Sequence, residues 1–174
     1  MVLDKLLGGD DASKPEKLLY LISSNSTDDG VLKGRKKLTK LVFFAEYWQP
    51  EDEMLNPNEQ FSGFNFIIYK YGPFSKELFK AFDELKDKDL VTEKRRPNGH
   101  SMIHTTEKGR ESVTSIEKKL SCEERDQVQI VRDRLSEKPG HELEDLSLNY
   151  LNIDKSEKEE YMGMPVSVVI SEES

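Results

Sequence analysis

The stretch between Phe64 and Thr106 places the strongest constraint on what this chain can fold into, and its centre is the run Tyr69–Ser75, with the sequence YKYGPFS. In Phe64–Tyr69 both alternating sets of side chains are largely apolar, which predicts a strand that is covered on both faces. Gly72-Pro73 predicts the turn that ends this strand. Ser75 is well placed to cap the helix that follows.

A hairpin is expected after this helix. Leu90–Thr92 predicts the start of a strand, Asn98-Gly99 is a strong signal for a two-residue hairpin turn, and Ser101–Thr105 predicts the returning strand. The order strand, turn, helix, hairpin is typical of the later half of a winged helix-turn-helix. Arg95 and Arg96 would then lie just before the tip of the wing.

Helices are expected on both sides of this stretch. A first helix should begin near Pro15, because proline fits a first helical turn. A second helix, Arg35–Trp48, is apolar around most of its circumference and should lie at the centre of the core. Further helices are predicted at residues 105–120, at residues 121–135 after a capping box, and around Leu143–Tyr150, while residues 50–62 should form a surface loop and Val166–Ile170 a strand or a tail.

Together these elements predict an α+β, mainly helical fold with a winged helix-turn-helix-like core, a small antiparallel sheet and additional C-terminal helices. A length of 174 residues suits one well-packed domain with a smaller appendage. We divide the chain into an N-terminal arm (residues 1–14), the winged-helix-like core (15–120), a helical C-terminal extension (121–153) and a charged tail (154–174).

The net charge of −8 is distributed unevenly along the chain. Residues 1–110 contain 18 basic and 18 acidic side chains, whereas residues 111–174 contain 8 basic and 16 acidic ones. General affinity for nucleic acids requires a basic surface that releases counterions from the phosphates. The charge therefore argues against general nucleic-acid binding. It does not exclude a basic patch on the neutral portion, residues 1–110.

The sequence also predicts the cellular setting. Cys122 is the single cysteine and cannot form an internal disulfide, so the fold does not depend on oxidising conditions. No apolar run approaches the roughly 20 residues that cross a bilayer. The apolar segment Val2–Leu7 is too short for a signal peptide. We therefore expect a cytoplasmic protein that does not bind membranes.

Three groups of basic residues are the candidate partner- or nucleic-acid-binding residues. The first crowds the start of the second helix, where the helix dipole is already positive, so that an anionic partner would offset the repulsion. The second lies at the start of the helix after Ser75, the end that approaches the bases in a recognition helix. The third lies at the wing, and each group could equally be ordinary solvated surface. The residues are Arg35, Lys36, Lys37, Lys40, Lys76, Lys80, Arg95 and Arg96.

No catalytic or metal-binding constellation stands out in the sequence. His100 and His104 have the spacing of helical metal ligands, but on a strand they would lie roughly 13 Å apart, too far to share one ion. Cys122 lies in the first turn of a predicted helix, but the acidic residues beside it oppose a thiolate. Ser75 has no histidine near it in the sequence. We expect no enzyme activity, no catalytic residue, no metal and no cofactor.

Four segments carry a resemblance to known proteins: Lys36–Phe44 (KKLTKLVFF), Phe66–Ser75 (FIIYKYGPFS), Leu85–Val91 and Thr105–Gly109 (TTEKG). Through them, residues 15–150 resemble the prokaryotic YwgA-like proteins and, more distantly, the Panacea or SocA-like antitoxin domain. Both groups share a "KLxKLxxF" helix, a "YGP" turn before a helix and a late threonine–glycine helix start. Resemblance to the Panacea domain implies a protein partner, since some of these domains neutralise a cognate toxin and one type acts as a proteolytic adaptor.

Two functional hypotheses follow. The first is a non-enzymatic, winged-helix-type interaction or regulatory module that binds a protein partner in an antitoxin-like way. The alternative is a DNA-binding transcriptional regulator that uses the helix after Ser75 and the wing at Arg95 and Arg96. We prefer the first because of the resemblance, the acidic C-terminal third and the lack of a catalytic pattern.

Overall fold

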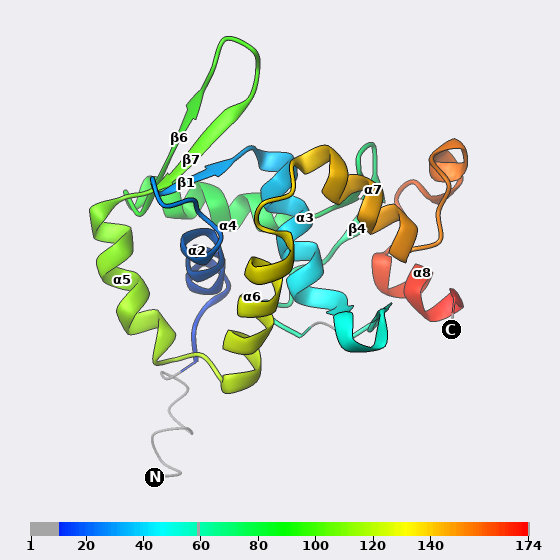
Figure 1. Ribbon diagram of the computed structural model, residues 1–174, viewed down its shortest axis with the longest axis horizontal. Coiled ribbons are helices and arrows are strands. Elements are labelled where there is room, and N and C mark those ends of the chain that lie inside the picture. The colour runs from blue at the N-terminus through cyan, green and yellow to red at the C-terminus, as the bar shows by residue number, and fades with distance from the viewer. Residues whose placement is uncertain (1–10, 59, 174) are drawn as a thin grey trace.

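The fold is α+β, with several helices and small antiparallel sheets, as the sequence predicts (Figure 1). The computed structural model describes residues 11–58 and 60–173. In chain order the elements, with 3-10 helices labelled η, are α2 (Lys14–Ser24), β1 (Val31–Lys33), α3 (Arg35–Tyr47), β2 (Trp48–Gln49), η1 (Pro50–Asp52), β3 (Met54–Leu55), β4 (Ile67–Tyr69), β5 (Gly72–Phe74), α4 (Lys76–Asp87), β6 (Val91–Arg95), β7 (Ser101–Thr105), α5 (Glu107–Glu117), α6 (Cys122–Leu135), α7 (Gly140–Tyr150), η2 (Lys155–Tyr161) and α8 (Val166–Glu173).

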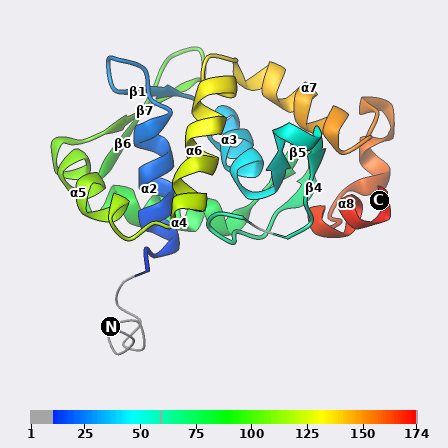
Figure 2. The ribbon, with the colours of Figure 1, turned by 60° about the horizontal axis from the view of Figure 1, so that its bottom comes forward.

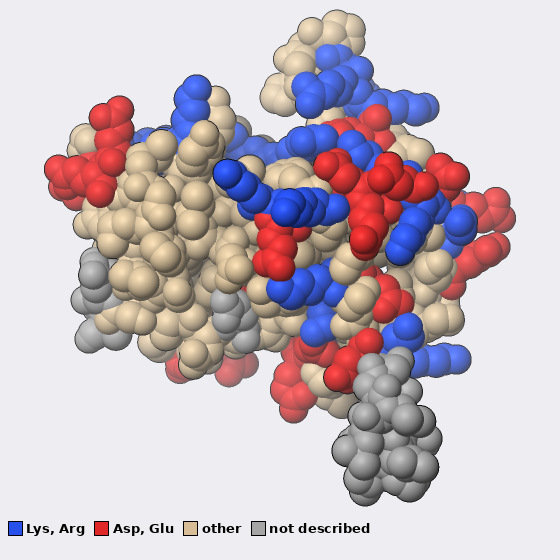
Figure 3. Space-filling view, turned by 180° about the vertical axis from the view of Figure 1, so that it is seen from behind, with Lys and Arg blue, Asp and Glu red and all other residues tan. Residues whose placement is uncertain are grey.

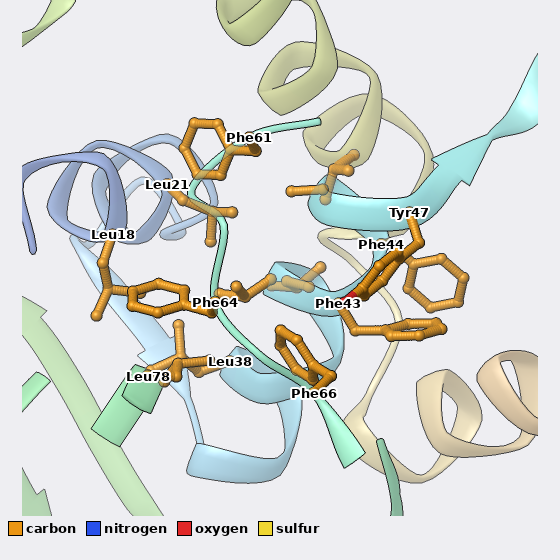
Figure 4. Close-up of a cluster of buried hydrophobic side chains, with 14 of the residues drawn as sticks. Leu18, Leu21, Leu38, Phe43, Phe44, Tyr47, Phe61, Phe64, Phe66 and Leu78 are labelled. Carbon is orange, nitrogen blue, oxygen red and sulfur yellow. The ribbon is translucent and has the colours of Figure 1, made fainter. Parts of the chain in front are cut away.

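Helix α3 lies at the centre of the molecule, as its sequence predicts (Figures 1 and 2). Every residue from Lys37 to Tyr47 is buried. The Phe43 ring packs edge-on against Phe44 and Phe66, with ring centroids 5.1 and 6.0 Å apart. Figure 4 shows Phe64 beside Leu18 of α2, with Phe43 and Phe44 on the other side of the loop that carries Phe64. Such edge-to-face pairs stabilise a core beyond the area they bury.

The predicted caps fix where the helices begin. Ser13 and Ser121 each form a complete capping box at the start of α2 and α6. The Ser75 hydroxyl accepts a hydrogen bond from the backbone N–H of Leu78 at 3.2 Å and so starts α4. Each bond pairs a donor that the helix itself leaves unsatisfied, and its loss typically costs about 1 kcal/mol. The caps predicted at Ser75 and at the start of α6 are confirmed, and Ser13 adds a cap that was not predicted.

A three-stranded antiparallel sheet carries the long hairpin, in the order β1-β7-β6. The hairpin projects away from the helices (Figure 1). Its turn differs from the two-residue turn predicted at Asn98-Gly99. The Arg96 N–H donates to the His100 carbonyl at 2.7 Å, which leaves three residues in the loop, and Gly99 takes the left-handed conformation with φ of +86°. A three-residue loop with glycine at this position is a common alternative turn.

The Tyr69–Ser75 run is itself part of a small hairpin, because β5 returns antiparallel to β4. The prediction of a strand covered on both faces is wrong. Phe66 and Ile68 are buried, whereas Tyr69 is 48% exposed, so burial alternates. The edge of β4 is covered instead, since the N–H of Ile68 donates to the carbonyl of Met164 at 2.9 Å.

The expected surface loop at residues 50–62 is tied to the end of α3. Leu55 and Phe61 are each only 5% exposed. The buried carboxylate of Glu46 accepts hydrogen bonds from the Ser62 hydroxyl at 2.8 Å and from the Gly63 N–H at 2.7 Å. The segment therefore contributes to the core, and the prediction of a purely surface loop is wrong.

The C-terminal segment is also folded differently from the prediction. Residues Val166–Ile170 lie in helix α8 and form neither a strand nor a tail. Val166, Val169 and Ile170 are buried, and their spacing places them on one face of a helix. The β-branched composition that favours a strand is overridden by this packing.

The division of the chain into arm, core, extension and tail stays a prediction. Most of the predicted arm, residues 1–10, lies outside the described residues, and α2 begins at Lys14. One hydrophobic cluster contains buried residues from Ala12 to Ile170.

Candidate interaction groove

An open groove of about 1280 Å³ lies between the tip of the β6–β7 hairpin, the start of α3 and the junction of α6 with α7. Seen from behind, lysines and arginines gather near the base of the projecting hairpin, while acidic side chains mix with basic ones on the neighbouring body (Figure 3). The basic residues that line the groove are Lys33, Arg35, Lys36, Lys37, Arg95, Arg96 and Arg132. The acidic residues that line it are Asp28, Asp133 and Glu137.

Two helices begin at this groove. Helix α3 starts after Gly34, which has φ of +97°, makes no side-chain cap hydrogen bond and is followed by no acidic residue in the first turn. Helix α7 starts after Pro139, also without a side-chain cap. They approach closely, since a Cβ on Gly140 would lie 3.3 Å from the backbone nitrogen of Lys37. The positive end of α3 therefore adds to the charge of the groove, whereas Glu142 in the first turn of α7 opposes the positive end of that helix.

Arg35 is held by an internal ion pair. Its guanidinium donates two hydrogen bonds to the carboxylate of Glu93, at 2.6 and 2.7 Å, and lies 5.2 Å from the centroid of the Phe79 ring. Lys86 adds a third bond to Glu93 at 3.2 Å. The hydrogen bonds from Arg35 lower the pKa of Glu93 from 4.5 to about 2. Arg35 therefore joins α3 to the hairpin and to α4.

Lys36 and Lys37 are also engaged inside the protein. The ammonium of Lys36 lies 3.0 Å from the carboxylate of Glu144 and 4.4 Å from the centroid of the Tyr71 ring. The ammonium of Lys37 donates a hydrogen bond to the Ser136 carbonyl at the end of α6. Burial lowers the pKa of Lys37. These two side chains fasten α7 and the α6–α7 junction to the start of α3.

Lys40 does not line the groove. Lys40 is only 2% exposed, and its ammonium donates a hydrogen bond to the carbonyl of Pro73 at 3.0 Å. Burial lowers the pKa of Lys40 from 10.5 to about 7, and the carboxylate of Glu144 opposes this effect only in part. Lys40 connects the middle of α3 to strand β5, so the "KLxKL" and "YGP" segments meet at this bond.

The comparison with protein families identifies the matched region of the chain. Residues 38–150 match the family model described as Antitoxin SocA-like, Panacea domain, which covers more than half of the 174 residues. The chain belongs to this family. Searches of curated proteins and of solved structures each gave no match. The Panacea part of the resemblance is thus confirmed, whereas likeness to the YwgA-like proteins stays a prediction.

The eight predicted basic residues are distributed over three places in and beside the Panacea domain. Five of them line the groove, at the start of α3 and at the hairpin: Arg35, Lys36, Lys37, Arg95 and Arg96. Lys40 is buried. Lys76 and Lys80 are exposed on α4 and are not among the groove's lining residues. Whether any of them contacts a partner stays a prediction.

Arg132 was missed by the sequence analysis. The helical spacing of the buried residues Val128, Val131 and Leu135 indicates that Arg132 lies on the exposed face of α6. Nothing local indicates that this face meets the groove, because that depends on how α6 packs on α3.

Three further features complete the description of the Panacea domain. Across residues 11–58 and 60–173, no three histidine, cysteine or acidic side chains gather as a metal site would require. Cys122 is exposed, with its sulfur 3.3 Å from the Nη2 of Arg125. In the same part of the chain no helix is both long and apolar enough to span a bilayer.

Proposed function

We propose that the protein is a non-enzymatic, antitoxin-like regulatory module that binds and restrains a protein partner. The observation that carries this proposal is the Panacea match over residues 38–150, which extends from α3 to the end of α7. The partner would be a toxin-like protein, because neutralisation of a toxin is what resemblance to this family implies.

We also propose that the part from α2 to β7 is a winged helix-turn-helix-like core. The order of its main elements supports this: helix α2, strand β1, helices α3 and α4, then the β6–β7 hairpin, with β7 between β1 and β6 in the sheet. The segment from β2 to β5 is then an insertion between the second and third helices. In this arrangement α4 takes the place of a recognition helix and the hairpin takes the place of a wing.

Co-expression tests the proposed partner binding. The product of a neighbouring gene that arrests growth is expressed alone, with this chain, and with a Leu38→Asp variant whose buried charge should prevent folding. We expect this chain, but not the variant, to restore growth and to co-elute with the neighbour's product in size-exclusion chromatography. Continued growth arrest, together with separate elution of the two folded proteins, would contradict the proposal.

DNA binding is a second candidate function, favoured by the exposed cations at the hairpin. Arg95 and Arg96 have no acidic partner among the described residues and lie where a wing would meet the phosphate backbone. A titration of duplex DNA at several salt concentrations tests this. Removal of one phosphate-contacting arginine should reduce the salt slope by about one. Affinity at low salt no better than that of an acidic control protein would exclude this function.

A further inference from the structure

Four exposed cations that line the groove lack an acidic partner among the residues that the structure describes, unlike Arg35 and Lys36. Lys33 lies at the end of β1, Arg95 at the end of β6 and Arg96 in the hairpin tip, all on one side. Arg132 lies on α6, on the other side. All four residues are exposed. The groove therefore presents free positive charge from both of its walls.

This concentration of charge is unusual in a chain of net charge −8. The open start of α3, which has no acidic residue in its first turn, adds partial positive charge to the same space. Like charges that face one another across a groove repel, so the arrangement costs free energy until an anion occupies it. At about 1280 Å³ the groove also exceeds the roughly 300–1000 Å³ of a drug-sized ligand site. A polymeric anion fits these dimensions better than a small one.

We propose that this groove binds an acidic segment of the protein partner. The inference rests on the proposed function, and it adds the location of the contact and the chemistry of the partner's segment. Arginine is suited to this task because its planar fork pairs with a carboxylate through two parallel hydrogen bonds. Three of the four unpaired cations, Arg95, Arg96 and Arg132, are arginines.

The acidic residues of the groove favour a polypeptide over a nucleic acid. Asp133 follows Arg132 in α6, and Glu137 lies just after the end of this helix. Asp28 lies on the loop between α2 and β1. Duplex DNA carries a charge for about every 1.7 Å of its axis, so its phosphates would also meet these carboxylates. A peptide can place its carboxylates at the arginines and uncharged side chains elsewhere. It therefore avoids the repulsion that a uniformly charged polymer encounters.

Fluorescence anisotropy with the full chain tests the proposal. The probes are a fluorescein-labelled peptide of eight glutamates and a labelled 12-base-pair duplex, each titrated at about 50 and 300 mM salt. The groove variant is Arg95→Glu with Arg96→Glu. The matched control is Lys88→Glu with Lys118→Glu, which makes the same change in net charge at exposed positions outside the groove. Circular dichroism and urea unfolding check that both variants remain folded.

We expect the peptide to bind wild type, and the groove variant to bind it at least tenfold more weakly at low salt, with a smaller difference at high salt. The control should stay within about twofold of wild type. Arg132→Glu, on the opposite wall, should weaken peptide binding about threefold. Equal losses in the groove variant and the control would overturn the proposal, as would lack of peptide binding. Tighter, equally groove-dependent binding of the duplex would assign the groove to nucleic acid.

The two proposals can fail separately. If co-expression shows a stable partner complex that the groove variant forms as well as wild type does, the groove inference is wrong while the proposed function stands. If the peptide binds in the groove but no partner is neutralised, the proposed function is wrong.

Discussion

The buried amine of Lys40 makes the stability of the protein depend on pH in a way that can be calculated. Its pKa is lowered from 10.5 to about 7 in the folded protein. Between these values the unfolded chain binds a proton that the folded protein does not bind. The free energy of unfolding therefore rises with pH over this range. The free-energy penalty for burying the Lys40 ammonium reaches its full size only below about pH 7. At 1.36 kcal/mol for each pKa unit, the penalty is about 4 kcal/mol at pH 7 and about 1 kcal/mol at pH 10.

Lys40→Met should therefore have opposite effects at the two ends of this range. The substitution leaves the carbonyl of Pro73 without its hydrogen bond, which costs about 2 kcal/mol at any pH. It also removes the penalty for burying the ammonium. We expect the variant to be more stable than wild type by about 2 kcal/mol at pH 7 and less stable by about 1 kcal/mol at pH 10. The two stability curves should cross near pH 9.

Urea unfolding followed by the fluorescence of the single tryptophan, Trp48, measures this directly. Trp48 is 4% exposed and should report the loss of the core around α3. Lys80→Met is the matched control, since Lys80 is exposed on α4 and its replacement makes the same change of residue type outside the core. A constant difference between Lys40→Met and wild type from pH 7 to pH 10, with unchanged m-values, would refute the reasoning.

Three further predictions concern the stability of the fold. Glu93→Gln should lower the free energy of unfolding by about 2 kcal/mol at pH 7, after allowance for solvent at the partly exposed guanidinium of Arg35. Because the pKa of Glu93 is about 2 rather than 4.5, this contribution is present above pH 4.5 and is lost as pH falls towards 2. Urea unfolding should therefore show a smaller difference between the variant and wild type at pH 3.5 than at pH 7. Gly109→Ala places a Cβ 2.2 Å from the carbonyl oxygen of Leu90 and should lower the free energy of unfolding by about 2 kcal/mol or more. Thr114→Ala, at an exposed position of the same helix, is the control and should change this free energy by no more than about 0.5 kcal/mol. Equal melting temperatures for these two variants would contradict the contact. Ser121→Ala should cost about 1 kcal/mol in urea unfolding through loss of the α6 cap, and an unchanged midpoint would argue against that cap.

Much of the helical structure could be predicted because its signals are local. The capping hydrogen bonds of Ser13, Ser75 and Ser121 join residues only three positions apart. The central place of α3 follows from its apolar composition. The short strand β1 was not predicted, since its three residues become a strand only by pairing with β7, about 70 positions later in the chain.

The candidate site was predicted only in part. The sequence indicates basic clusters at the start of α3 and at the hairpin, and these do line one groove. It does not distinguish the buried Lys40 from Lys36 one turn earlier, although only Lys36 lines the groove. The difference arises because β5 covers the middle of α3 and the chain's other segments leave its start open. Arg132 joined the site through the packing of α6 alone.

The sequence by itself determined the helix starts, the burial of α3 and the presence of a hairpin, because each depends on hydrogen bonds or apolar spacing within a few residues. Only the tertiary structure decided which cations are free. Arg35 pairs with Glu93 and Lys37 with the Ser136 carbonyl, 58 and 99 positions further along the chain. Burial and charge pairing depend on such distant partners, and the unpaired charge that remains at Arg95, Arg96 and Arg132 depends on them too.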